Sequence, residues 1–287
     1  MIGPMAITTF QVDSPLGTWT ANEWRPPHLV SVVEFFWHFD GRVAVPRERV
    51  FPSGRLELIV QLDATYRLID GAGAESCPVT CLTGLQTSPF VIEAPDRPCR
   101  VMGIRFHPVG AYAVLGVPLS EVSGLTVDLQ DLAGRAAIEL TERCQGAVTV
   151  EERFRRAAEW VAGRVARSPG ADPAVSWIAR QIEQSGGAVS IAELRERTGL
   201  TKTRLAAAFR EQIGVAPKLY ARILRFRRLL GMLHAGAGPL SDLALTAGYY
   251  DQPHMNAEFR ELSGLTPREF LAGQRFVNSV SLAEQPS

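Results

Sequence analysis

Two segments, fifty residues apart, carry polar and basic side chains at matching positions. TKTRLAAAFREQIGVAPKLYA (201–221) aligns with DQPHMNAEFRELSGLTPREFL (251–271). Each keeps one apolar face for packing at helical spacing. The opposite face carries groups that hydrogen-bond base edges or neutralise phosphates. The pattern predicts contact with nucleic acid through Lys202, Thr203, Arg204 and Arg210 in the first segment and Gln252, His254, Asn256 and Arg260 in the second.

A short apolar helix and a glycine turn are expected before each segment. Residues 191–197 lead to Thr198-Gly199, and residues 240–247 lead to Gly248. A helix, a tight turn and a second helix make a helix-turn-helix unit, and glycine suits the turn because it accepts positive φ. Residues 218–233 predict one helix between the units. Two such units about one DNA turn apart could enter successive major grooves of double-stranded DNA.

Charge is divided unevenly along the chain. The 287 residues carry 30 Lys+Arg and 30 Asp+Glu, yet residues 1–172 sum to −4 and residues 173–273 to +4. This asymmetry predicts a regulatory part joined to an anion-binding part. The sequence has no apolar run of about 18 residues and no visible signal peptide. We therefore expect a cytoplasmic protein that does not enter a membrane.

Residues 173–273 resemble the two-unit DNA-binding domain of AraC/XylS-type transcription regulators. The most specific stretch is AGYYDQPHMNAEFRELSGLTPREF (247–270), which is similar throughout to the second-unit signature of that family. Residues 51–62, 103–122 and 127–134 resemble, more weakly, the β-rich sensor domain of one subgroup. The resemblance implies a sequence-specific DNA-binding regulator whose first half senses a small molecule.

Ala207 and Ala257 depart from the family, which usually has arginine at both positions. A hydrogen bond from arginine to guanine is the commonest specific base contact. Without arginine at this position, the first unit has few side chains left that can hydrogen-bond base edges. We therefore expect the first unit mainly to contact phosphates and the second to read more of the bases, where Gln252 and Asn256 suit adenine. The predicted helix between the units, which we call the connector, also carries arginines. We expect these to pack or to remain in solvent: Arg222, Arg225 and Arg228.

Short apolar segments typical of strands fill the first half of the chain. Residues 29–39, 56–62, 91–94 and 100–106 are separated by clusters of Gly, Pro, Asp and Ser. Strands at this spacing favour an antiparallel sandwich or barrel. The expected fold class is α+β with two domains, a cupin-like β-rich domain followed by an all-α double helix-turn-helix domain.

The change from strand to helical periodicity sets the expected domain boundaries. We expect a β-rich sensor domain over 1–148, a connecting helix and linker over 149–172, the DNA-binding domain over 173–273 and a flexible tail over 274–287. Thr149 and Glu152 fit a capping box at the start of the connecting helix. Its apolar stripe would suit either a dimer contact or packing on the chain's own β-rich domain.

Three side chains in the first half are candidates for contact with a small molecule. Trp37, Arg55 and Arg105 could line a pocket, because the interior of a small β-barrel can hold one ligand. A purely structural role is the alternative for each. No nucleophile elbow, Walker loop or dinucleotide fingerprint is present, so no catalytic residues and no cofactor are expected.

The four cysteines do not have the paired spacing of a zinc site. Cys77, Cys81, Cys99 and Cys144 lack two CxxC knuckles, so we expect reduced structural thiols and no metal. Redox sensing at Cys77 and Cys81 is the lesser alternative.

The leading hypothesis is a transcription regulator and not an enzyme. Its expected partners are double-stranded DNA, an unidentified small-molecule effector and, in a homodimer, a second copy of the chain. Ligand binding would shift the population between DNA-competent and incompetent arrangements. Two alternatives stay open: a β-domain enzyme or redox sensor tethered to DNA, and a protein-interaction module with weakened DNA binding.

Overall fold

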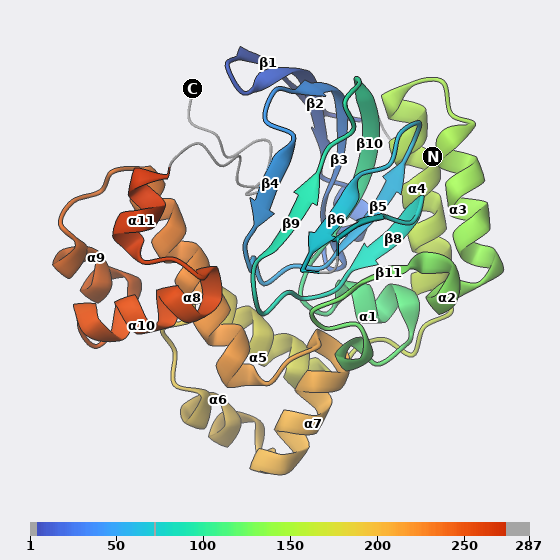
Figure 1. Cartoon of the computed structure of the whole chain (residues 1–287). Helices are drawn as coiled ribbons and strands as arrows, with labels where there is room; N and C mark the ends of the chain where they lie inside the picture. Colours follow the sequence, from blue (N-terminus) through green and yellow to red (C-terminus); the bar gives the residue numbers. More distant parts are fainter. Residues whose placement is uncertain (1–4, 72, 274–287) are drawn as a thin grey trace.

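The computed structural model describes residues 5–71 and 73–273, so the tail predicted over 274–287 lies outside the described residues. The first half contains two antiparallel sheets that face each other (Figure 1). The larger sheet has the order β1 (Ile7–Ser14), β2 (Gly17–Trp24), β3 (Val33–Val43), β10 (Cys99–Phe106), β5 (Glu57–Gln61), β8 (Thr80–Thr83) and β11 (Thr126–Asp128). The smaller sheet has the order β4 (Arg47–Val50), β9 (Phe90–Glu93), β6 (Arg67–Asp70) and β7 (Gly73–Ser76).

Strand β3 shows why the larger sheet is apolar on both faces. Successive side chains of a strand point to opposite faces. Phe36 lies with its ring centre 6.0 Å from that of Phe154, on the helical side of the sheet. Phe35 and Trp37 line a cavity on the side of the smaller sheet. Because both faces are buried, this strand has a continuous apolar run instead of an alternating pattern.

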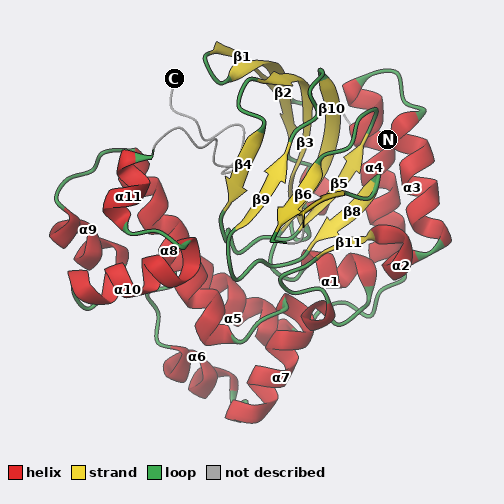
Figure 2. Ribbon diagram, viewed as in Figure 1, coloured by secondary structure: helices red, strands yellow, loops and turns green. Residues whose placement is uncertain are grey.

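Helices cover the face of the larger sheet that points away from the smaller one (Figures 1 and 2). Phe154, Ala158 and Val161 of the last of these helices are fully buried. Of the two roles that its stripe left open, packing on the chain's own β-rich domain is the one observed, so only residues 166–172 link the domains. The helical segments of this half are η1 (Pro27–Leu29), α1 (Gly110–Leu115), η2 (Leu119–Glu121), α2 (Leu129–Ala133), α3 (Arg135–Gln145) and α4 (Val150–Val165).

Seven helices form the second half of the described chain: α5 (Pro173–Gln184), α6 (Ile191–Thr198), α7 (Lys202–Ile213), α8 (Pro217–His234), α9 (Leu240–Ala247), α10 (Gln252–Ser263) and α11 (Pro267–Ala272). Several of these helices start at a side-chain cap. Asp172 caps α5 ahead of a proline, Ser190 caps α6, and Thr266 forms a complete capping box with Glu269. The predicted α+β fold with two domains is confirmed. No helix among the described residues is long and apolar enough to cross a membrane.

Candidate functional site

The two predicted helix-turn-helix units are present and have the same construction. Helix α6 is followed by α7, and α9 by α10, with a left-handed glycine at each turn. Gly199 has φ +67° and Gly248 has φ +92°, values that a residue with a Cβ rarely adopts. Helix α8 joins the units as the single connector that the sequence predicted (Figure 1).

The candidate contacts of the first unit all lie on the surface. Lys202, Thr203 and Arg204 occupy the first turn of α7 and are exposed, as is Arg210 near its end. Ala207 is also exposed, one turn beyond Thr203. This face therefore offers positive charge and a methyl group, which suit phosphate contacts and apolar contact with thymine.

The second unit presents a more polar surface on α10. Gln252 is half-buried and His254 is exposed, but the imidazole Nε2 lies 3.4 Å from Glu258 Oε1. Asn256 is half-buried, and its amide oxygen is buried with no hydrogen-bond partner among the described residues. The Asn256 amide must therefore turn outward before that oxygen can accept a hydrogen bond from adenine. Arg260 is exposed and free to reach a phosphate.

Two connector arginines fix α10 to α8. Arg222 Nε donates to Glu258 Oε1 at 2.9 Å, and Arg225 Nη2 donates to both carboxylate oxygens of Glu258 at 3.0 and 3.1 Å. The Arg225 guanidinium also lies 5.0 Å from the centre of the Tyr249 ring. Of the two roles expected for Arg222 and Arg225, packing is the one observed. Their bonds hold the second recognition helix at a set orientation on the connector.

A cavity of about 210 Å³ lies between the two sheets, and we call it the intersheet cavity. Trp37, Arg55 and Arg105, predicted separately from the sequence, all line it. Arg105 on β10 donates from Nε to Glu57 Oε1 of the neighbouring strand at 2.6 Å, and its side chain is only 6% exposed. The three residues thus come together around one cavity that has both apolar and charged walls.

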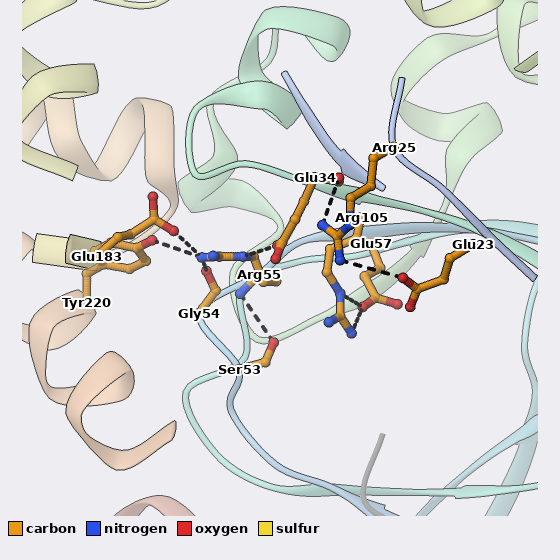
Figure 3. Close-up of polar contacts among 10 residues, drawn as sticks. All are labelled: Glu23, Arg25, Glu34, Ser53, Gly54, Arg55, Glu57, Arg105, Glu183 and Tyr220. Carbon is orange, nitrogen blue, oxygen red and sulfur yellow. Dashed lines mark hydrogen bonds and ion pairs between the residues drawn. The ribbon is translucent and has the colours of Figure 1, made fainter. Parts of the chain in front are cut away.

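Arg55 belongs both to the cavity wall and to the boundary between the domains (Figure 3). Its Nε donates to Glu34 Oε2 of β3 at 2.6 Å. Its Nη1 lies 2.5 Å from Glu183 Oε1 of α5 and 3.5 Å from the Tyr220 hydroxyl of α8. One guanidinium therefore joins the β-rich domain to two helices of the DNA-binding half.

Neighbouring residues of the same loop also reach the helices. Phe51 packs edge-on against Phe226 of α8 and Phe270 of α11, with ring centres 6.3 and 5.9 Å apart. Gly54 has φ +72°, and a Cβ there would lie 2.7 Å from Leu224 Cδ2. Phe51, Ser53 and Arg55 all line the intersheet cavity. We call residues 51–55 the coupling loop, because they contact the cavity on one side and the helices on the other.

The charges of this cluster are stable. Burial alone would lower the pKa of Arg55, but contacts with Tyr220, Glu34 and Glu183 outweigh it and raise that pKa above its ordinary value. Burial likewise opposes ionisation of Glu34, but the charge and hydrogen bond of Arg55 hold the pKa of Glu34 below its usual range. Arg55 and Glu34 therefore remain an ion pair near neutral pH.

The cysteines do not have the surroundings of a reactive site. All four are free and buried, and burial raises the pKa of Cys77 to about 11 and of Cys81 to about 12. A thiol with a raised pKa is a poor nucleophile near neutral pH. Within the described residues, no group of three or more His, Cys, Asp or Glu side chains could hold a metal.

Sequence reasoning missed the residues that complete the coupling between domains. Phe51, Gly54, Glu183 and Tyr220 are far apart in the sequence and come together only in the fold. In the sequence, Pro52-Ser53-Gly54 is one of the Gly, Pro, Asp and Ser clusters that separate the predicted strands. The usable signal was the left-handed turn followed at once by a charged residue, but nothing in the sequence identified its partner.

Two family models match the chain, one in each half. Residues 194–273 match a family model described as a helix-turn-helix domain, and residues 25–128 match one described as a domain of unknown function (DUF6597). The HTH-type transcriptional activator RhaR of Yersinia pseudotuberculosis is 30% identical over 99 residues, which are 34% of this chain and 33% of RhaR. A putative AraC-like transcription regulator of Streptomyces antibioticus is 26% identical over 99 residues, 34% of this chain and 29% of its own length.

The similarity to these relatives therefore spans about a third of their length. The structure of ToxT from Vibrio cholerae aligns with 79% of this chain and 96% of its own at 11% identity and a TM-score of 0.44. The paired units and the family match agree on the helical half. Through that half, the chain is similar to helix-turn-helix transcription regulators, among them RhaR and an AraC-like regulator.

Proposed function

We propose that this protein is a DNA-binding transcription regulator whose DNA-binding half is controlled by a small molecule in the intersheet cavity. DNA contact is assigned to the exposed faces of α7 and α10, within residues 173–273. The observation that carries ligand control is the coupling loop, whose Arg55 lines the cavity and bonds to Glu183 and Tyr220 of the helical half.

The mechanism follows from that shared loop. A ligand that touches Phe51, Ser53 or Arg55 changes the free energy of docking between the domains, because the same residues make the docking contacts. The first unit is also held by the β-rich domain, where the Tyr112 hydroxyl donates to Glu211 of α7 at 2.9 Å. Undocking frees both units to adopt the spacing that DNA requires, and ligand binding shifts the population between the two arrangements.

The experiment that tests DNA binding recovers genomic fragments bound by the full chain and sequences them. The recovered motif then serves as the probe in a fluorescence anisotropy titration over a range of salt concentrations. Replacing a phosphate contact, as in Lys202→Ala or Arg204→Ala, should weaken binding to all sequences and reduce the salt slope by about 1. Arg135→Ala, an exposed arginine on α3, is the matched control and should change neither.

Base readout is tested on the second unit. Gln252→Ala and Asn256→Ala should each cost about 1–3 kcal/mol on the recovered motif and relax the preference at one base pair. If both variants keep the wild-type preference, the second unit does not read bases through these amides. Absence of any DNA binding at low salt would instead favour a protein-interaction module.

A further inference from the structure

Aromatic rings come into the intersheet cavity from both sheets and from the coupling loop. The rings that line it are those of Trp19, Phe35, Trp37, Phe39, Phe51, Tyr66 and Phe90. The aliphatic side chains of Val43, Ile59 and Ile92 also line it. Aromatic rings prefer to meet another ring edge-on or in an offset stack. These walls therefore favour a ligand that is itself largely apolar and contains a ring.

The arginines on these walls already have carboxylate partners. Arg105 Nε donates to Glu57 Oε1 at 2.6 Å, and the side chain of Arg105 is 6% exposed. Arg55 is paired with Glu34 and Glu183 (Figure 3). An anionic ligand would gain an arginine only by displacing one of these carboxylates, which would then remain buried beside a like charge. The walls therefore disfavour an anion.

The carboxylates that line the cavity also have partners within the chain. Glu57 accepts from Arg105, and Glu48 interacts with another group of the protein. Glu23 lies 3.5 Å from the guanidinium of Arg25 and has a further partner as well. A cation would have to compete with partners that are already in place, and moving its charge from water into a buried site is costly. The walls therefore disfavour a cation too.

Uncharged polar groups on the walls likewise form their hydrogen bonds within the chain. The Gln61 amide donates to one backbone carbonyl and accepts from one backbone N–H. Gln86 Nε2 donates to two backbone carbonyls, and the hydroxyl oxygens of Thr83 and Thr126 lie 3.3 Å apart. A sugar in this cavity would leave many of its own hydroxyl groups without hydrogen bonds, which is unfavourable in a buried site.

The volume of the cavity suits a small fused ring system. An apolar cavity of about 150 Å³ holds benzene, and the intersheet cavity has about 210 Å³. A single aromatic ring with a second ring fused to it therefore matches the space.

We propose that the intersheet cavity binds an uncharged, mainly apolar molecule that contains an aromatic ring, and that it selects against ions of either sign and against sugars. This inference rests on the proposed function, since it names the ligand class of the same site. The wall rings hold the molecule by burial and ring contact. Among them, Phe51 links it to the coupling loop, because that ring also packs against Phe226 and Phe270.

Probes that share one fused-ring body test the preference for an uncharged ligand. They are indan-2-ol, the cation indan-2-ylammonium and the anion indane-2-carboxylate, each titrated calorimetrically into the full chain, with D-xylose as the uncharged polar probe. Indan-2-ol should bind at least about tenfold more tightly than either ion, and D-xylose should not bind at millimolar concentration. A preference below about threefold, tighter binding of an ion or of D-xylose, or no binding of indan-2-ol at millimolar concentration would overturn the proposal.

Glu57→Gln tests whether the internal ion pairs are the reason for that preference. Glutamine removes the charge with which the buried Arg105 is paired. Indane-2-carboxylate should then bind about tenfold more tightly than it binds the wild type, while indan-2-ol changes by less than about threefold. Glu139→Gln, in an exposed pair on α3, is the matched control and should change neither. If the Glu57→Gln protein keeps its affinity for indan-2-ol and gains none for the carboxylate, pairing is not what excludes anions and the argument fails.

Two variants of the smaller sheet locate the bound probe. Ile92 of β9 lines the cavity and Ile69 of β6 does not, although both side chains are half-buried. Ile92→Trp should fill part of the space and weaken indan-2-ol about tenfold or more, whereas the matched change Ile69→Trp should leave it unchanged. Equal effects of the two changes would mean that the probe binds elsewhere.

DNA anisotropy with and without indan-2-ol separates this proposal from the proposed function. If indan-2-ol binds with the expected preference but leaves DNA affinity unchanged, ligand control fails and the ligand class stands. If DNA binding is intact and an ion binds most tightly, only the ligand class is refuted.

Discussion

Glu183→Gln is the sharpest test of how the domains are held together. Glu183 belongs to α5 and does not itself line the cavity, so its replacement removes a docking partner of Arg55 without changing a wall residue. Glutamine keeps the shape of the side chain and removes the charge that lies 2.5 Å from Arg55 Nη1. Arg55 keeps Glu34 and the Tyr220 hydroxyl as partners, so the β-rich domain itself is undisturbed.

The size of the effect follows from the burial of the pair. The side chains of Arg55 and Glu183 are 9% and 18% exposed, so solvent screens their attraction weakly. Breaking a buried ion pair costs about 3–5 kcal/mol, whereas an exposed pair contributes at most about 1 kcal/mol. Because Glu34 still neutralises Arg55, we take about 2 kcal/mol, which lowers the ratio of docked to undocked molecules about 30-fold.

Labelling of an introduced thiol measures that ratio. Leu224 is 6% exposed and lies beneath the coupling loop, so Leu224→Cys reacts with a maleimide only when the domains separate. The four native cysteines are buried and give a slow background. In this Leu224→Cys background, Glu183→Gln should raise the labelling rate about 30-fold under conditions where opening is a rapid pre-equilibrium. Glu159→Gln, in an exposed pair on α4, is the control; a change below about threefold, or an equal change in the control, would refute the reasoning.

Three further predictions concern single positions. Gly54→Ala should destabilise docking by about 1–2 kcal/mol, because the new Cβ meets Leu224 at a positive φ, and the same labelling assay measures it. Thr266→Ala removes the capping box of α11 and should lower the free energy of unfolding in denaturant by about 1 kcal/mol. Burial lowers the pKa of His38 to about 4, so the unfolded chain takes up a proton that the folded chain does not as pH falls from about 6.5 to 4. Wild-type stability should therefore fall relative to His38→Phe by up to about 1.4 kcal/mol per pH unit over that range, and parallel pH profiles would contradict this.

Local signals were enough to predict most of the helical half. A helix-turn-helix repeats its glycines and apolar positions at a set spacing, so the turn glycines Gly199 and Gly248 were visible in the sequence. The connector arginines were also assigned correctly. Their partner Glu258 was not, because a side chain on α8 and one on α10 meet only after the helices pack.

The β-rich half was predicted less completely for a physical reason. Residues 129–145 form α2 and α3, yet they were assigned to the sensor domain without a predicted helix. Strands in the smaller sheet have only four residues each and give weak periodicity. Trp37, Arg55 and Arg105 were selected as candidates by residue type, but their common cavity depends on strand pairing and register, which the sequence does not display.

The separation between cavity walls and coupling loop bears on how such a regulator can change its specificity. Walls such as Trp19 and Phe90 belong to the sheets, whereas Phe51 and Arg55 of the lining also contact α8, and Phe51 contacts α11. Under the proposed ligand control, wall positions can therefore be varied, by evolution or in a library, while the contacts between the cavity and the helical half are preserved. Under that proposal the protein would serve as a scaffold for genetically encoded biosensors, in which altered walls recognise a new compound and the DNA-binding half stays unaltered.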